Sequence, residues 1–201
     1  MERPALVVHG FDTSNNMKVR VALGYKGIPY EFRAIDPAER DGIVRLSGQR
    51  LTPVIEHGRV VLFDSAAILR YLDANFPETP RLFGDSREEQ WEIEDWELFA
   101  RTRLAGPMME VVHGRVAGKD VDKATFARFA ADFERATSEL ADRIGSGEWI
   151  VGGRMTAADV TAAPVLFRIR KAELFPWPAA AERIQGWTDR VMAFDGRARL
   201  E

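Results

Sequence analysis

The sequence has 201 residues, of which 46% are hydrophobic, enough for one large domain or two small ones with an ordinary packed core. Its 28 basic and 31 acidic residues give a formal net charge of -3, which argues against nucleic acid or an anionic membrane as a partner. The chain has no cysteine, and this excludes a disulfide framework, a thiolate metal site and a nucleophilic thiol supplied by the protein itself.

The first part of the chain predicts alternating strands and helices. Short apolar runs rich in Val and Ile are separated by turn residues, and apolar residues at helical spacing follow two of them. The predicted strands are residues 5–9, residues 30–35 and a hairpin at residues 54–62, and the predicted helices are residues 16–26 and 65–75. A right-handed crossover then makes the first two strands parallel.

Strand patterns end at the proline-containing segment 76–80, and helical periodicity follows. We therefore predict one domain at residues 1–77, a linker at residues 78–85 and a helical domain at residues 86–201. The predicted helices of the second domain are residues 87–112, kinked near Gly106 and Pro107, and residues 126–144, 156–170 and 179–193.

Neither a signal peptide nor an apolar stretch of membrane-spanning length is found in the sequence. We expect a cytoplasmic protein without a membrane partner.

The three histidines are isolated, so we assign no metal site. Thr156 and Asp159 fit a helix capping box with a structural role. The aromatic residues of the second domain have helical spacing, and we predict that they belong to its core: Trp91, Trp96, Phe126, Phe129 and Phe133.

Three separated segments resemble the glutathione transferase family, in the order expected for that family. They are residues 10–23, residues 52–55 with 64–72, and residues 152–159. The chain is similar to the cytosolic, serine- or threonine-type members, of bacterial or zeta- or theta-like kind. This resemblance implies an α/β thioredoxin-like N-terminal domain with the order β-α-β-α-β-β-α, followed by an all-α C-terminal domain.

The resemblance places the catalytic contact to the glutathione sulfur at Thr13 or Ser14. Counting back from Lys18 favours Thr13, whereas serine is the residue type that the family uses more often, and we keep both as candidates. A thiol with a pKa of about 8.5 is only a few per cent thiolate at neutral pH. A hydroxyl that donates to the thiolate at a helix N-terminus supplies roughly 1.5 to 3 kcal/mol. Without the family, either residue is an ordinary helix cap.

The resemblance also implies the residues that bind glutathione: Asn15, Arg50, Val54, Asp64 and Ser65. A cis Pro53 would turn the backbone of Val54 toward the peptide, while Asp64 would meet its ammonium group and Ser65 its γ-glutamyl carboxylate. Leu51 stands where the family has a polar Lys or Gln, and Arg50 beside it could reach the same carboxylate of the ligand.

We therefore predict an enzyme that activates the glutathione thiol for attack on a small apolar electrophile bound between the domains, in a homodimer that needs glutathione and no metal. Two alternatives stay open. One is another glutathione-dependent reaction, such as isomerisation, dehalogenation or peroxide reduction. The other is a transferase-like binding module with weak affinity for glutathione, which Leu51 favours. The sequence does not identify the electrophile.

Overall fold

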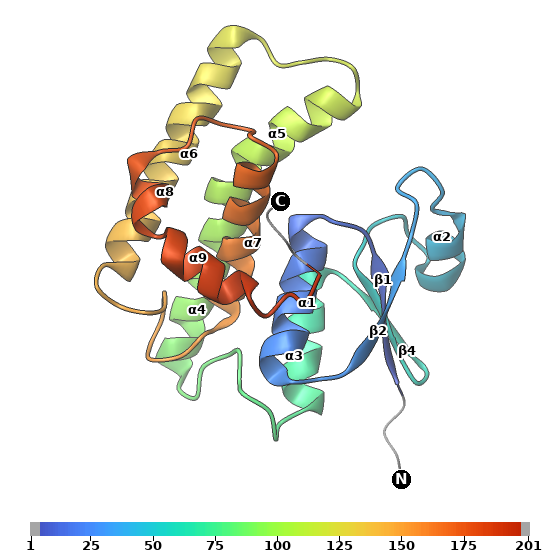
Figure 1. The fold of residues 1–201 in the computed structure, drawn as a ribbon. Helices are drawn as coiled ribbons and strands as arrows, with labels where there is room; N and C mark the ends of the chain where they lie inside the picture. Colours follow the sequence, from blue (N-terminus) through green and yellow to red (C-terminus); the bar gives the residue numbers. More distant parts are fainter. Residues whose placement is uncertain (1–4, 198–201) are drawn as a thin grey trace. The chain divides into compact units, whose positions relative to one another are not determined.

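A computed structural model describes residues 5–197 of the chain. The chain divides into two compact units, one of residues 5–83 with 193–197 and one of residues 84–192 (Figure 1). The first unit combines a sheet with helices, and the second is helical throughout its described residues. The predicted fold class is confirmed, and the order of elements in the first unit is the β-α-β-α-β-β-α of the prediction.

The sheet of the first unit has four strands in the spatial order β2-β1-β3-β4. The strands are β1 (Leu6–Gly10), β2 (Tyr30–Ala34), β3 (Val54–His57) and β4 (Val60–Phe63). β2 runs parallel to β1, and β3 runs antiparallel to both β1 and β4. Val8 and Ile55 face each other across the central pair of strands and are completely buried. The sheet is therefore centred on its most apolar strands, as the short apolar runs predict.

Two helices, α1 (Ser14–Lys26) and α3 (Ser65–Asn75), lie against each other on one face of this sheet, and α2 (Asp41–Ser47) lies on the other (Figure 1). α1 begins at the N-cap residue Thr13 and ends at Gly27, whose φ of 64° favours glycine. The core under the two helices consists of fully buried aliphatic side chains, including Leu23, Ile68, Leu69 and Leu72. Both helices therefore start on a rigid support, and those starts form the candidate site described below.

The C-terminal segment of residues 193–197 packs on α1 and so belongs to the first unit. A Cβ atom on Gly24 would lie 2.0 Å from the backbone oxygen of Phe194. The rings of Tyr25 and Phe194 meet edge to face with centroids 5.4 Å apart. Gly24 is therefore the residue that lets the returning segment approach the helix backbone.

The second unit consists of helices, and its described elements are α4 (Arg87–Phe99), the π-helical segment η1 (Ala100–Leu104), α5 (Ala105–Val116), α6 (Lys123–Ile144), α7 (Ala157–Lys171), α8 (Ala179–Arg183) and α9 (Gln185–Met192). α7 is buried along most of its length and packs against α4, η1 and α9. The predicted capping box of Thr156 and Asp159 is present at its start. Within residues 5–197 the structure has no helix of the length and apolarity that crossing a bilayer requires.

Three details of the second unit differ from the prediction. The long helix has no simple kink at Pro107; it widens into η1 just before that residue, where Pro107 leaves a carbonyl one turn back without its helical donor. The predicted helix at 179–193 is two short helices that are separated at Ile184. Of the five aromatic residues predicted to be core, Phe133 is completely buried and Trp91 is 57% exposed. The other three, Trp96, Phe126 and Phe129, are partly buried.

Candidate functional site

Thr13 and Ser14 lie at the start of α1, directly after the turn that follows β1. Thr13 is half-buried, and its Oγ1 accepts hydrogen bonds from the side-chain Nδ2 of Asn16 at 2.7 Å and, more weakly, from the backbone N–H of Asn16 at 3.4 Å. Within residues 5–197 no acceptor is found for the Thr13 hydroxyl proton, so that proton can be donated to a ligand. Ser14 is the first residue of the helix and is only 7% exposed.

Asn16 is a site residue that the sequence reasoning missed. Its side chain is completely buried, and its Nδ2 donates both to Thr13 and to the hydroxyl of Thr52 at 3.1 Å. A Cβ on Gly10 would lie 1.7 Å from Asn16 Oδ1, so the glycine at the end of β1 makes room for this amide. Gly10 and Asn16 were the available signal, but nothing in the sequence shows that the Asn16 amide lies against the backbone of Gly10.

Asp64 and Ser65 lie at the start of α3. Asp64 has a φ of 70° and a ψ of 113°, which is a strained backbone conformation for a residue with a side chain. Its Oδ1 accepts the N–H groups of Ala66 and Ala67, both at 3.0 Å, and within residues 5–197 its Oδ2 has no partner. Asp64 is therefore both the cap of α3 and an exposed carboxylate with one oxygen available to a cationic ligand group.

A hydrogen bond joins the two helix starts, because Ser65 Oγ donates to Asn15 Oδ1 at 3.4 Å. Thr13, Asn15 and Ser65 are thus brought together by the packing of α1 against α3. Each helix N-terminus carries the positive end of a helix dipole. Two such ends close together favour negatively charged ligand groups, such as a thiolate and a carboxylate.

Val54 approaches the same place from the sheet. The peptide bond between Thr52 and Pro53 is cis, as the resemblance implied, and β3 begins directly after it. Val54 itself is buried and is paired with His9 of β1 and Phe63 of β4. The amide of Asn16 ties Thr52 in this loop to Thr13 at the start of α1. The loop, α1 and α3 therefore contribute to one site.

Arg50 is not joined to these residues by any contact found within residues 5–197. Its side chain is 61% exposed and lies 3.8 Å from Asp41, the first residue of α2. The polar Gln49 folds back on its own loop, where its Nε2 donates to Ser47 Oγ and to the carbonyl of Leu51, and its Oε1 accepts the N–H of Leu51. Leu51 is 69% exposed. The hydrogen bonds of Gln49 therefore stabilise the conformation of the loop and do not point toward the candidate site.

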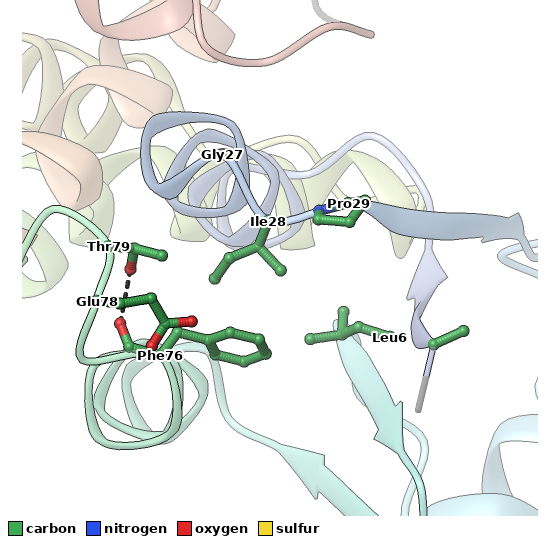
Figure 2. Close-up of a pocket in the computed structure, with 8 residues that line it drawn as sticks. Leu6, Gly27, Ile28, Pro29, Phe76, Glu78 and Thr79 are labelled. Atoms are coloured by element: carbon green, nitrogen blue, oxygen red, sulfur yellow. Dashed lines mark hydrogen bonds between the residues drawn. The ribbon is translucent and has the colours of Figure 1, made fainter. Parts of the chain in front are cut away.

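A cavity of about 240 Å³ lies at the opposite end of the first unit (Figure 2). The apolar side chains of Leu6, Ile28 and Phe76 line it from different sides. Leu6 begins β1, whereas the candidate site follows Gly10 at the other end of that strand. The cavity is smaller than the roughly 300 Å³ at which ligand pockets usually begin, and we do not assign it to the site.

Two sequence models of one family match the chain. Residues 8–80 match the N-terminal domain of glutathione S-transferase, and residues 123–190 match the C-terminal domain. This chain belongs to the glutathione S-transferase family. The prediction of a glutathione transferase enzyme is confirmed at this level, as a glutathione-dependent transferase or isomerase. The first match contains every predicted site residue.

The chain is also similar to individual family members. It is 26% identical over 183 residues to a probable maleylacetoacetate isomerase of Vibrio cholerae, covering 85% of this chain and 84% of that protein. The crystal structure of glutathione transferase Omega 3C from Trametes versicolor has a TM-score of 0.80 at 19% identity, covering 98% of this chain and 85% of that one. A rice glutathione transferase in complex with glutathione has a TM-score of 0.78 at 22% identity, covering 96% and 90%. These two structures show the same fold.

Proposed function

We propose that the first unit binds glutathione and lowers the pKa of its thiol for attack on a small apolar electrophile. The observation that carries this proposal is the meeting of the two helix starts, through Ser65 and Asn15, beside the loop tied by Asn16. In the reaction the thiolate sulfur forms a bond to an electrophilic carbon, and a leaving group departs with the bonding electrons or the adduct takes up a proton.

Thr13 is the proposed contact to the sulfur. It is the N-cap of α1, its oxygen accepts from Asn16, and among the described residues its proton has no acceptor, so it can be donated to the sulfur. Ser14 is one position past the N-cap, and within residues 5–197 no hydrogen bond orients its hydroxyl as Asn16 orients that of Thr13. The helix dipole adds about 0.3 to 1 kcal/mol to the roughly 1.5 to 3 kcal/mol of a charge-assisted hydrogen bond. Together these contributions lower the thiol pKa by about one to three units.

Ser65 and Asp64 are proposed to hold the γ-glutamyl end of glutathione. The hydroxyl of Ser65 and the positive end of the α3 dipole suit its carboxylate, and Asp64 Oδ2 suits its ammonium group. The backbone of Val54 is proposed to pair with the peptide, and Asn15 to support Ser65 through their hydrogen bond. Arg50 remains a candidate for the glycyl carboxylate, and its exposed side chain would have to leave the neighbourhood of Asp41.

The role of Thr13 is tested by titrating the thiol of enzyme-bound glutathione through the ultraviolet absorbance of the thiolate. Thr13→Ala is expected to raise the pKa of that thiol by about one to two units, because one charge-assisted hydrogen bond is lost. Thr13→Ser keeps the donor and is expected to stay within about half a unit of the parent. Ser14→Ala is the matched control. A larger shift for Ser14→Ala than for Thr13→Ala would assign the sulfur contact to Ser14.

A second candidate function is glutathione-dependent isomerisation, favoured by the similarity to the probable maleylacetoacetate isomerase. In that reaction the thiolate adds to a conjugated double bond, the new single bond rotates, and elimination returns the thiolate. Glutathione is regenerated in this reaction but is consumed in stoichiometric amounts by conjugation. An assay of free thiol during turnover of maleylacetoacetate and of a conjugation substrate therefore separates the two functions.

A homodimer and a cytoplasmic location are also part of the proposal. Two-fold symmetric dimers are the commonest oligomers, and the family assignment makes glutathione the expected ligand of each subunit. Light scattering on the purified protein measures the mass directly and compares it with the 22.6 kDa of one chain. The mass of a single chain at micromolar concentration would reject the dimer without affecting the assignment of the glutathione site.

A further inference from the structure

Arg20 is a buried charged residue of α1 that the proposed function does not use. Its Nε and Nη2 donate to the two carboxylate oxygens of Asp195 at 2.8 to 3.1 Å, and both side chains are 0% exposed. Burial lowers the pKa of Arg20, but the hydrogen bond and the charge of Asp195 offset this, and the pKa lies above its ordinary value. The guanidinium is therefore charged and held in one orientation by the C-terminal segment.

The same guanidinium contacts the turn that leads to Thr13. Nη2 of Arg20 lies 3.0 Å from Oδ1 of Asp12, whose side chain is 65% exposed. Arg20 is seven residues after Thr13 in the chain, about 10 Å along the helix axis. Helical side chains lean toward the N-terminus, so the long side chain of Arg20 can reach back to this turn. The Asp12–Arg20–Asp195 cluster thus connects the C-terminal segment to the residue before Thr13.

The position of Thr13 matters because hydrogen bonds to a developing or stabilised anion depend strongly on distance and direction. Within the turn, the backbone N–H of Thr13 donates to the carbonyl of Phe11 at 2.9 Å, and Asn16 donates to the Thr13 hydroxyl oxygen. The ion pair to Arg20 is the contact that ties the side chain of Asp12 to α1. A displacement of about 1 Å at such a site can cost on the order of 100-fold in rate.

We propose that Arg20 is a positioning residue: Asp195 fixes its guanidinium, and the guanidinium holds Asp12 so that the neighbouring Thr13 keeps its hydroxyl on the glutathione sulfur. The inference rests on the proposed function, and it gives the C-terminal residues 193–197 a role in the glutathione site of the first unit.

The test uses Asp12→Ala and Asp12→Asn, because Asp12 is exposed and neither change threatens the core. Both variants remove a negative charge, which by itself stabilises a nearby thiolate and lowers its pKa equally in both. Only Asp12→Asn keeps an oxygen that accepts from Arg20. If Arg20 positions Thr13 through residue 12, the pKa of the bound thiol should be about one unit higher in Asp12→Ala than in Asp12→Asn. The pKa in Asp12→Asn should equal that of the parent protein or lie below it. Equal pKa values in the two variants would overturn the inference.

Amide hydrogen exchange without glutathione supplies a second readout. The N–H of Thr13 is expected to exchange about tenfold faster in Asp12→Ala than in the parent protein, and within about twofold of the parent in Asp12→Asn. Unchanged exchange in Asp12→Ala would overturn the positioning role even if glutathione binds normally. If the parent protein does not bind glutathione, the proposed function fails, and the exchange experiment alone then decides whether Arg20 holds the turn.

Discussion

Asp159 joins three segments of the second unit, and its replacement by alanine is expected to lower the free energy of unfolding of that unit. The completely buried carboxylate accepts the backbone N–H groups of Ile150 and Thr156, both at 2.9 Å, and the Thr156 hydroxyl and the indole N–H of Trp187, both at 3.0 Å. Asp159→Ala leaves three buried N–H donors without this acceptor. At about 1 to 3 kcal/mol for each unsatisfied group, with partial relaxation, the loss is about 3 to 5 kcal/mol.

Urea unfolding followed by tryptophan fluorescence measures this loss. Asp142→Ala is the matched control, because Asp142 is 71% exposed and forms a surface ion pair with Arg183 at 3.0 Å. The control is expected to stay within about 1 kcal/mol of the parent protein. A loss for Asp159→Ala as small as that of the control would refute the reasoning, since it would mean that the buried donors find other partners.

The pH dependence of stability provides an independent check on Asp159. Burial raises the pKa of its carboxyl group, although hydrogen bonds from Ile150, Thr156 and Trp187 oppose the shift. Because the folded-state pKa lies above the unfolded value of about 4, the folded protein binds the proton more tightly. This contribution to stability is complete below pH 4 or so and is lost as the pH rises through the folded-state pKa. The difference in unfolding free energy between the parent and Asp159→Asn should therefore fall as the pH rises from about 4 through the folded-state pKa. A difference that does not change with pH would contradict a raised pKa for Asp159.

Three further predictions concern single positions. Gly10→Ala places a Cβ against Asn16 Oδ1, and it is expected to lower stability by about 1 to 3 kcal/mol in urea unfolding and to weaken glutathione binding in calorimetry; unchanged values would show that the amide moves freely. Gly24→Ala improves helix propensity by about 1 kcal/mol, but its Cβ would collide with the Phe194 carbonyl. The substitution should therefore destabilise the protein and speed proteolysis of the C-terminal segment, and a stabilised variant would contradict the close contact. Hydrogen bonds from Thr125 lower the pKa of Asp122, the N-cap of α6. Asp122→Ala should therefore destabilise α6 at pH values above the unfolded-state pKa of Asp122, and this loss should disappear as the pH falls through its folded-state pKa. A loss that does not depend on pH would refute the role of the charge.

Local patterns were sufficient for most of the fold. The short apolar strands, the cap residue Thr13 and the capping box at Thr156 are set by neighbouring residues, which a sequence shows directly. The return of residues 193–197 to α1 depends on two contacts, Gly24 with Phe194 and Arg20 with Asp195. In each contact the two residues are 170 or more positions apart in the sequence. No periodicity reports such contacts. Likewise Trp91 has the spacing of a core residue, and only packing shows that its face of α4 is exposed.

The candidate site could be predicted in part. The resemblance named Thr13, Asn15 and Ser65, and the structure brings them together. Arg50 was chosen for its charge beside Leu51, but the loop conformation is set by the side chain of Gln49, and Arg50 lies near Asp41 instead. Asn16 was missed because its importance comes from one buried amide that bonds to two different loops.

The central claim is that the first unit binds glutathione at the two helix starts, and calorimetric titration with reduced glutathione tests it most directly. The matched pair is Ser65→Ala, which removes the hydroxyl at the start of α3, and Ser138→Ala, which removes a hydroxyl from α6 of the second unit. We predict that the parent and Ser138→Ala bind glutathione and that Ser65→Ala loses most of the affinity. No binding to the parent protein at millimolar glutathione, or equal binding to Ser65→Ala, would contradict the account.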